Sequence, residues 1–263
     1  MKQFPRKVVC LTEESVETLY LLGRQESIAA VSKYVMRPAE ARSLPKVTSF
    51  IKSNYDKIAE IDPDLIIGFS DIQKDIARDL VERGYNVFIA NQRNVVEILD
   101  YIQWLGNLFD AAHEAKVLVD KLQGIIASTS AKGSAMINKP RVYFEEWYDP
   151  MITGIGWVSD CIEISGGIDI NREKSQGTLA KDRFVSSEEI IKKNPDVIFV
   201  CWCGKPADIK RITARPGWQE IKAIKHGQIY ELPPEIFLQP GPAPVLDGLG
   251  IMQKYLTGVA GIL

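Results

Sequence analysis

The stretch KIAEIDPDLIIGF, residues 57–69, decides the fold. It begins as a helical turn or two, which Asp62-Pro63 ends because a proline disfavours the helical conformation in the residue before it. The apolar run Leu65–Phe69 that follows has the continuous hydrophobicity of a strand covered on both faces, as in a parallel sheet that lies between helices. The stretch therefore predicts an α/β fold assembled from β-α-β units.

The segments on either side of this stretch extend the same pattern. Short apolar runs predict strands, and helices are expected where capping residues precede an apolar periodicity and a glycine ends it. The predicted strands cover residues 7–11, 28–31 and 86–90, and the predicted helices cover residues 12–22 and 72–83. The polar stretch from residue 32 to about 53 is predicted to be an ordered loop.

The second half of the chain resembles the first half. Residues 190–200, IIKKNPDVIFV, resemble residues 57–67, since both hold a helix end, a Pro-Asp pair and a buried strand. Duplication explains this best, and the alternative is that Pro-Asp is simply a common helix-to-strand junction. Strands are predicted at 141–145, 197–201 and 228–232, and helices at 157–165, 187–194, 207–213 and 244–255.

The residues between the halves are predicted to be mostly helical. From 94 to 130 there is no proline, and apolar residues recur at helical spacing up to a predicted break at 132–134. About 20 helical residues span about 30 Å, enough to cross from one lobe to another. We therefore predict two similar α/β lobes with mostly parallel sheets, joined by one long helix, with a ligand cleft between them. The N-terminal lobe is predicted at 1–93, the linker helix region at 94–132 and the C-terminal lobe at 133–263.

Composition narrows the function classes. The 32 basic and 34 acidic residues nearly balance, which gives no support for nucleic-acid binding. No apolar run approaches the roughly 20 residues that span a bilayer, so no transmembrane segment is expected. The start, MKQFPRKVVCL, passes directly into a strand pattern, which predicts no signal peptide and a cytoplasmic protein. The alternative is a periplasmic or cell-surface protein whose export signal has been removed.

Across nearly its whole length the chain resembles the substrate-binding proteins of ABC importers for cobalamin, haem and iron chelates, and most of all the cobalamin-binding members. In this class a single helix joins two lobes. The resemblance is carried by KVVCLTEESVETLYLLG, KIAEIDPDLIIG, RVYFEEWYDPMITGIGWVSDCIEISGG and HGQIYELPPEIFLQPGPAPVLDGLG. It implies a ligand held by loops at the carboxyl ends of both sheets, with little hinge motion on binding.

The resemblance also implies a permease partner, with an acidic residue on each lobe that meets arginines of the membrane subunit. In the C-terminal lobe Leu238 stands at this position and Glu235 is near it. In the N-terminal lobe the matching stretch is Ser43–Lys46, with Glu40 as the nearest acid. An ABC permease is therefore a possible partner whose docking acids are not clearly present.

The candidate ligand-binding residues follow predicted strands or begin predicted helices, where they would face the cleft. They are Glu13, Glu14, Tyr34, Phe50, Phe69, Ser70, Trp147, Tyr148, Gly156, Trp157, Trp202 and Phe237. Tryptophan offers a flat apolar face to a macrocycle, and glycine turns offer backbone amides to polar groups. The alternatives are helix capping for Thr12 and the two acids, and packing inside a lobe for the aromatics. Trp104 is expected in the core and Trp218 against a surface helix.

No metal site is predicted. Cys201 and Cys203 supply only half of a tetrahedral zinc site, and His113 and His226 lie far from them in the sequence. These two and the other cysteines, in apolar segments, are expected to be buried free thiols. Haem needs one axial donor, which Tyr34, Tyr148 or His226 could provide.

Enzyme motifs are absent from the sequence: it has no nucleophile elbow, no phosphate loop and no dinucleotide fingerprint. Glu145 and Glu146 could do acid–base work only if neighbours on a strand faced the same side, which is unusual. We predict a non-catalytic protein that needs no cofactor and binds a small molecule, with cobalamin or another corrinoid as the first candidate, as the binding component of an ABC-type uptake system. The alternatives are a haem or ferric-siderophore binding protein, and a cytosolic corrinoid-handling accessory protein or enzyme without a permease. Few arginines in the predicted walls weaken the siderophore alternative.

Overall fold

The structure is a computed structural model that describes residues 4–261. It divides into two compact α/β units. The first unit holds the described residues up to Gln92 together with Val96–Leu122, and the second holds Arg93–Val95 together with the described residues from Gln123 onward. The ends of the two predicted lobes, residues 1–3 and 262–263, lie outside the described residues.

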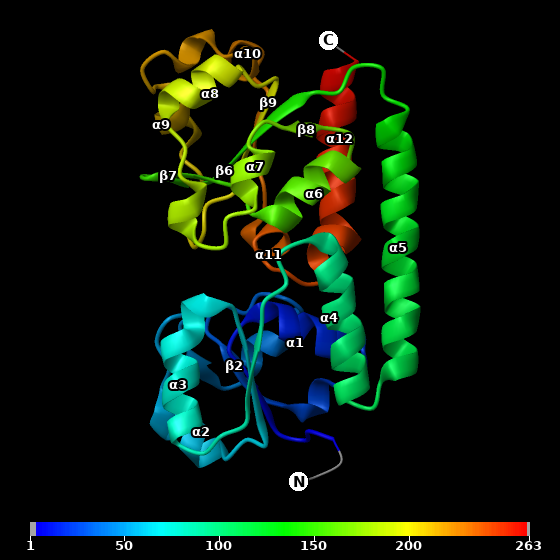
Figure 1. The fold of residues 1–263 in the computed structure, drawn as a ribbon, viewed down its shortest axis with the longest axis vertical. Coiled ribbons are helices and arrows are strands. Elements are labelled where there is room, and N and C mark those ends of the chain that lie inside the picture. Colours follow the sequence, from blue (N-terminus) through cyan, green and yellow to red (C-terminus); the bar gives the residue numbers. More distant parts are fainter. Residues whose placement is uncertain (1–3, 262–263) are drawn as a thin grey trace. The chain divides into compact units, whose positions relative to one another are not determined.

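The first unit contains a parallel five-stranded sheet, sheet A, with the strand order β3-β2-β1-β4-β5. Its strands are β1 (Val8–Cys10), β2 (Ile28–Ser32), β3 (Lys46–Thr48), β4 (Leu65–Phe69) and β5 (Val87–Ala90). The helices are α1 (Glu13–Leu21), α2 (Tyr55–Ile61), α3 (Lys74–Glu82) and α4 (Val95–Leu108). Figure 1 shows α2 and α3 on one side of the sheet and α1 and α4 on the other. Sheet A is therefore covered on both faces, as its apolar strands predict.

The second unit contains sheet B, with the strand order β10-β9-β6-β7 and β8 paired to β6. Among the pairings between the strands described here, only β6–β7 is antiparallel, so the prediction of mostly parallel sheets is confirmed. The strands are β6 (Arg141–Tyr148), β7 (Met151–Thr153), β8 (Ile168–Asp169), β9 (Val197–Val200) and β10 (Ile229–Glu231). The helices are α6 (Gly156–Ile164), α7 (Arg172–Ser175), α8 (Ser187–Lys193), α9 (Ile209–Thr213), α10 (Lys222–Lys225), α11 (Pro234–Phe237) and α12 (Leu249–Ala260).

The two Pro-Asp segments have the same local structure. The residues before the prolines, Asp62 and Asn194, both adopt the left-handed conformation that ends a helix, with φ of 50° and 44°. The Asp64 carboxylate accepts hydrogen bonds from two backbone N–H groups just before β1. The Asp196 carboxylate accepts one from the first residue of β6, at 2.9 Å. Each aspartate thus fixes one strand to its neighbour, which favours duplication over a chance junction.

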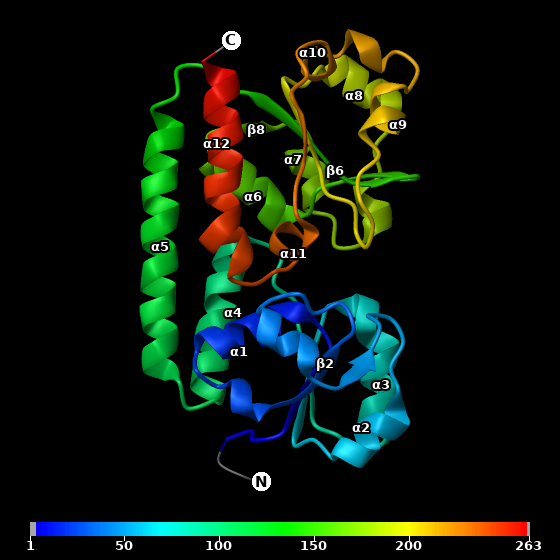
Figure 2. The same cartoon turned by 180° about the vertical axis from the view of Figure 1, so that it is seen from behind.

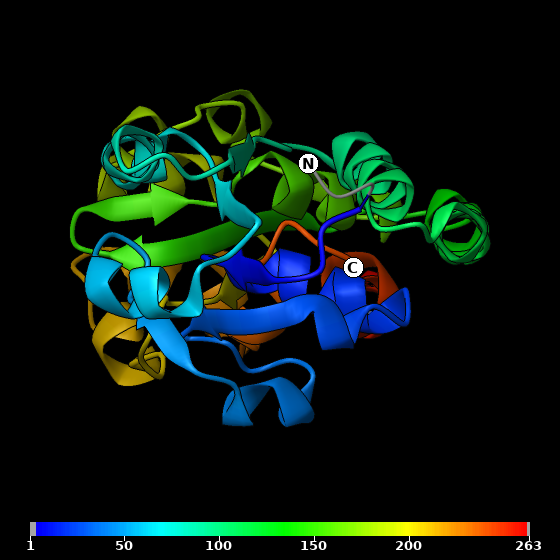
Figure 3. The ribbon, with the colours of Figure 1, turned by 90° about the horizontal axis from the view of Figure 1, so that it is seen from below.

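The region predicted as one long helix contains two helices, α4 and α5 (Ala112–Ser134). A turn with Asp110 in the left-handed conformation, φ 55°, separates them. The helices then run side by side (Figure 3), with Gly106 against Ala115 so closely that a Cβ on the glycine would lie 2.2 Å from that of the alanine. Of the two, α5 is the helix that begins in the first unit and ends in the second.

The predicted break at residues 132–134 is wrong, because α5 continues to Ser134. Its glycine there, Gly133, serves close packing: a Cβ at this position would lie 2.8 Å from backbone atoms of Gly166, just after α6. Within the second unit α5 also lies beside α12 (Figure 2), and the Gln253 side-chain amide donates to the Thr129 carbonyl at 2.8 Å.

The predicted loop over residues 32–53 is also wrong in part. It contains the short strand β3 and a 3₁₀ turn at Ala39–Ser43. Three residues that follow a proline are too few to show a strand pattern, so only the pairing with β2 reveals this strand.

Candidate functional site

An aromatic cluster stands at the carboxyl end of sheet B. Trp147 and Tyr148 are the last residues of β6, and Trp202 follows β9, the parallel neighbour of β6. The ring centroids of Tyr148 lie 4.9 Å from Trp147 and 4.8 Å from Trp202. Trp147 and Tyr148 are half-buried, whereas Trp202 is buried beneath them. The structure thus brings Trp202 against Trp147 and Tyr148, two predicted site residues that are far from it in the sequence.

Two cations lie against the aromatic cluster. The ammonium of Lys205 is 3.9 Å from the ring centroid of Tyr148 and 5.0 Å from that of Trp202. The guanidinium of Arg211 lies 4.3 Å from the Tyr148 centroid. A hydrogen bond from Lys205, together with the charges of both cations, lowers the pKa of the Tyr148 hydroxyl. Sequence reasoning missed both cations, because neither follows a strand directly.

A buried ion pair supports the cluster from below. Glu145 is fully buried and accepts hydrogen bonds from two nitrogens of Arg215, at 2.5 and 3.0 Å. The same carboxylate accepts from the Trp202 indole at 3.2 Å and from the Tyr143 hydroxyl at 3.3 Å. The position of the Trp202 ring is therefore fixed by a network rather than by packing alone.

The next residue, Glu146, bonds a different arginine. Arg183, whose side chain is 5% exposed, donates to both Glu146 carboxylate oxygens. Glu145 and Glu146 thus form ion pairs with different arginines, as expected for neighbours on a strand, whose side chains point to opposite faces. Each is already held in an ion pair, so the structure adds no support for acid–base chemistry by this pair.

Three other predicted site residues lie in the interior of the second unit. Trp157 is 3% exposed, and its indole donates to the carbonyl of Phe237, which is fully buried, at 2.9 Å. A Cβ on Gly156 would lie 2.3 Å from the Arg93 carbonyl oxygen, so chain packing already requires this glycine. Trp157 is thus nearly buried, and its indole N–H is used inside the unit. Ligand contact by these residues stays a prediction.

The first β-α turn carries two buried acids. Thr12 precedes α1, but its hydroxyl donates to the Glu14 carboxylate at 2.5 Å and caps no helix N–H. The capping alternative is therefore wrong for Thr12. Burial raises the pKa of Glu14 to about 8, and Glu13 beside it is buried as well.

An apolar rim lies at the carboxyl end of sheet A. We give this name to Tyr34, Met36, Ile51 and Ile72, which are between 44% and 61% exposed. They follow β2, β3 and β4 in the chain. Of these four, only Tyr34 was predicted as a site residue, because Met36 and Ile51 lie in loops and Ile72 belongs to a segment that was predicted to be helical. Exposed large apolar groups at one end of a sheet are typical of a binding surface.

Two predicted site residues beside this rim have strained backbones. Phe50 and Ser70 adopt positive φ, 71° and 59°, which is unusual for residues other than glycine. Gln73, fully buried, joins their loops: its amide donates to the Phe50 carbonyl at 2.7 Å and accepts from the Phe69 N–H at 2.9 Å. Phe69 itself is 7% exposed. Nothing in the sequence marks Gln73 as the residue that holds these two loops.

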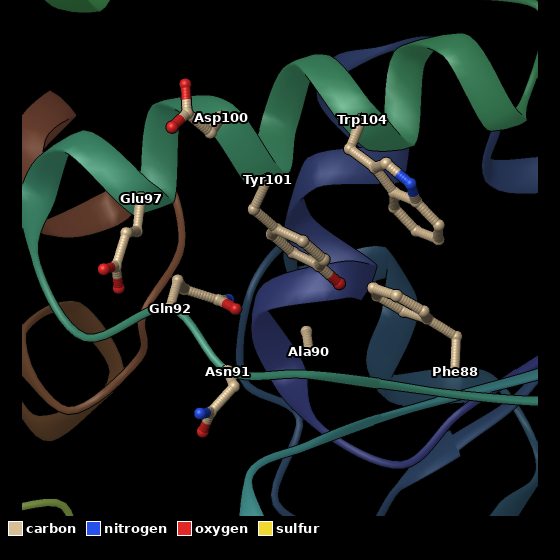
Figure 4. Close-up of a pocket in the computed structure, with 8 residues that line it drawn as sticks. All are labelled: Phe88, Ala90, Asn91, Gln92, Glu97, Asp100, Tyr101 and Trp104. Atoms are coloured by element: carbon tan, nitrogen blue, oxygen red, sulfur yellow. The ribbon is translucent and has the colours of Figure 1, made fainter.

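A pocket of about 380 Å³ also lies in the first unit, between β5 and α4 (Figure 4). Its lining residues are Phe88, Ala90, Asn91, Gln92, Glu97, Asp100, Tyr101 and Trp104. Trp104 stacks on Phe88 with centroids 3.8 Å apart and is 36% exposed, so its predicted place in the core is wrong. Trp218, expected against a surface helix, is instead fully buried in the core of the second unit.

The thiols and charges give no sign of a metal centre. Within residues 4–261, no group of three or more His, Cys, Asp or Glu could hold a metal ion. Cys10, Cys161 and Cys201 are buried free thiols, as predicted, but Cys203 is exposed because the chain has already left β9. Among the same residues, no helix is both long and apolar enough to span a membrane.

Comparison with known proteins identifies the family. Residues 8–236 match the family model described as periplasmic binding protein. The chain is 26% identical to an uncharacterized ABC transporter substrate-binding lipoprotein of Bacillus subtilis, with 92% of this chain and 77% of that protein aligned. It is also 26% identical to a vitamin B12-binding protein of Vibrio vulnificus, with 91% and 86% aligned.

A solved structure shows the same fold. The periplasmic heme-binding protein of Roseiflexus sp. RS-1 in its apo form superimposes with a TM-score of 0.80 over 97% of this chain and 99% of that one, at 19% identity. The family match spans both sheets and reaches from β1 to α11. The chain therefore belongs to the periplasmic binding protein family.

Proposed function

We propose that this chain is the substrate-binding component of an ABC-type uptake system and that it binds a corrinoid, with cobalamin as the first candidate. Membership in the periplasmic binding protein family supports the general role. The name of the Bacillus subtilis relative supports the link to an ABC transporter, and that of the Vibrio vulnificus relative supports the ligand. The role is binding, without catalysis.

The observation that carries the ligand proposal is the aromatic cluster. Trp147, Tyr148 and Trp202 meet at the carboxyl ends of the parallel neighbours β6 and β9, where open α/β folds place ligand sites. Aromatic side chains offer large rigid surfaces at a low conformational-entropy cost, which suits a flat macrocycle. The apolar rim of the first unit offers a second hydrophobic surface at the equivalent end of sheet A.

Haem is the second candidate, and Tyr148 favours it. The cations beside its hydroxyl lower its pKa and thus stabilise the phenolate, the form in which tyrosine binds ferric iron. Tyr34, the other predicted tyrosine ligand, is 47% exposed beside Lys33.

Titration of the purified protein with cyanocobalamin, haemin and a ferric siderophore tests the proposal. Calorimetry and visible absorbance measure the binding. We expect tight binding of cyanocobalamin, and replacement of the half-buried indole in Trp147→Ala should weaken it by more than about 1 kcal/mol. Trp104→Ala, which removes a partly exposed tryptophan outside the cluster, is the control and should leave the affinity unchanged. Circular dichroism verifies that both variants fold. Absence of binding by cyanocobalamin and haemin would reject the proposal.

The permease partner and the location follow from the same role. Glu40 is exposed and Glu235 is half-buried on α11, so these two acids are our candidates for docking. The relative described as a lipoprotein favours a place outside the cytoplasmic membrane over the cytoplasmic alternative. Cell fractionation tests the location, and a pull-down of the permease with Glu40→Gln and Glu235→Gln tests the docking. Capture that both variants leave undiminished would exclude these two acids.

A further inference from the structure

The charges of the second unit fall into two groups. Arg183 and Arg215 are nearly buried, and each donates two hydrogen bonds to one carboxylate. These pairs neutralise charge inside the fold, as burial requires. Lys205 and Arg211 are exposed, and within the described residues neither forms an ion pair with an Asp or a Glu. Both lie instead against the Tyr148 ring.

A ligand that covers the aromatic cluster must therefore cover two cations. If the ligand were neutral at this place, it would take water away from both cations and return no opposite charge, which is unfavourable. An anionic group on the ligand would receive charge-assisted hydrogen bonds from both side chains instead. The aromatic faces hold the cations in place before the ligand arrives, which reduces the conformational entropy lost on binding.

We propose that Lys205 and Arg211 bind an anionic group, a carboxylate or a phosphodiester, on a ligand whose flat ring lies on the half-buried members of the aromatic cluster, Trp147 and Tyr148. The inference rests on the proposed function and defines the class of ligand for the same site. It adds one lysine and one arginine to walls that were expected to hold few arginines. The two sources of anion are the carboxylates of a porphyrin and the phosphodiester of a complete corrinoid.

Two pairs of probes separate these sources. Haemin and haemin dimethyl ester share one ring, and the ester lacks the two carboxylates. Cyanocobalamin carries one phosphodiester, and dicyanocobinamide lacks this group. We expect the anionic member of one pair to bind at least about tenfold more tightly than its partner, and the pair that shows the difference identifies the source. Because exposed charges are screened by salt, the difference should shrink between about 0.05 and about 0.5 M NaCl, a range over which the Debye length falls about threefold.

The variants Lys205→Gln and Arg211→Gln should each weaken the anionic probe about tenfold, and the double variant should abolish the difference within the pair. Lys210→Gln is the matched control, since Lys210 is exposed on the same helix as Arg211 and contacts none of the three rings. Tight binding that Lys205→Gln and Arg211→Gln leave unchanged would overturn the inference and leave the proposed function standing. If none of the four probes binds, the proposed function fails and the inference fails with it.

Discussion

The most demanding test of the second unit is the replacement of Arg215 by leucine. Glu145 is fully buried, and within the described residues Arg215 supplies two of the four hydrogen bonds to its carboxylate and the one ion pair. The donors that would remain are neutral: the Trp202 indole at 3.2 Å and the Tyr143 hydroxyl at 3.3 Å. Arg215→Leu therefore leaves a buried carboxylate without an opposite charge.

Removing one partner of a buried ion pair typically costs about 3–5 kcal/mol. The Arg215 side chain is 14% exposed, so water can reach part of the cavity, and we expect a loss near the lower limit, about 3 kcal/mol. The double variant Glu145→Leu/Arg215→Leu should recover most of this loss, because it removes the uncompensated charge together with its partner.

Urea unfolding monitored by tryptophan fluorescence measures these free energies, and four of the five tryptophans lie in the second unit. Lys116→Gln is the control, since it breaks an ion pair with Asp120 in which both side chains are more than half exposed. The reasoning is refuted if Arg215→Leu lowers the free energy of unfolding no more than Lys116→Gln does, or if the double variant is less stable than Arg215→Leu alone.

Two further variants test burial and close packing in other parts of the chain. Burial holds the pKa of Glu14 at about 8 in the folded state, above its ordinary value of 4.5, so wild-type stability should fall as pH rises from 5 to 8. Glu14→Gln should remove this fall in the free energy of unfolding, which amounts to as much as about 3 kcal/mol. The control Glu60→Gln, at an exposed position, should retain it. Equal pH profiles for wild type and Glu14→Gln would contradict the burial of Glu14. Gly133→Ala should destabilise the protein by about 1–3 kcal/mol, because the new Cβ would lie 2.8 Å from Gly166. The control Gly124→Ala, on the same helix but with open space around it, should stabilise the protein by about 0.5–1 kcal/mol. Thermal unfolding of both variants measures this difference, and an equal gain in stability from both would show that α5 does not pack closely at Gly133.

The fold could be predicted because its decisive signals are local. Leu65–Phe69 and Val197–Val200 are apolar on both faces, and each follows a Pro-Asp pair that ends a helix. Such signals need no knowledge of distant residues. The errors arose where tertiary contacts override local preference. The strand β3 is recognisable only through its pairing with β2. Gly133 was read as a helix break, but the close contact with Gly166 requires a glycine inside the helix at this position.

The candidate site could be predicted only in part, because position after a strand indicates where a side chain lies but not what it contacts. Trp147 and Trp157 looked equivalent in the sequence, since both are tryptophans beside a predicted strand end or helix start. The structure leaves Trp147 half-buried against Tyr148, and it uses the Trp157 N–H for the carbonyl of Phe237. This difference depends on a residue 80 positions away, which no local pattern contains.

Charge presents the same difficulty in a stronger form, because the role of a cation depends on whether an acid is near it in space. Arg211 and Arg215 are four residues apart and indistinguishable in the sequence. Arg215 forms an ion pair with the buried Glu145, 70 positions earlier in the sequence, and its charge is therefore neutralised inside the fold. Among the described residues, the Arg211 guanidinium lies against the ring of Tyr148 and forms no ion pair, so its charge stays available. In the second unit, the buried arginines are neutralised by acids, whereas Lys205 and Arg211 lie beside an aromatic surface and form no ion pair within the described residues. This is the charge pattern of a site for an anionic ligand. A neutral ligand bound there would have to be stabilised by contacts elsewhere.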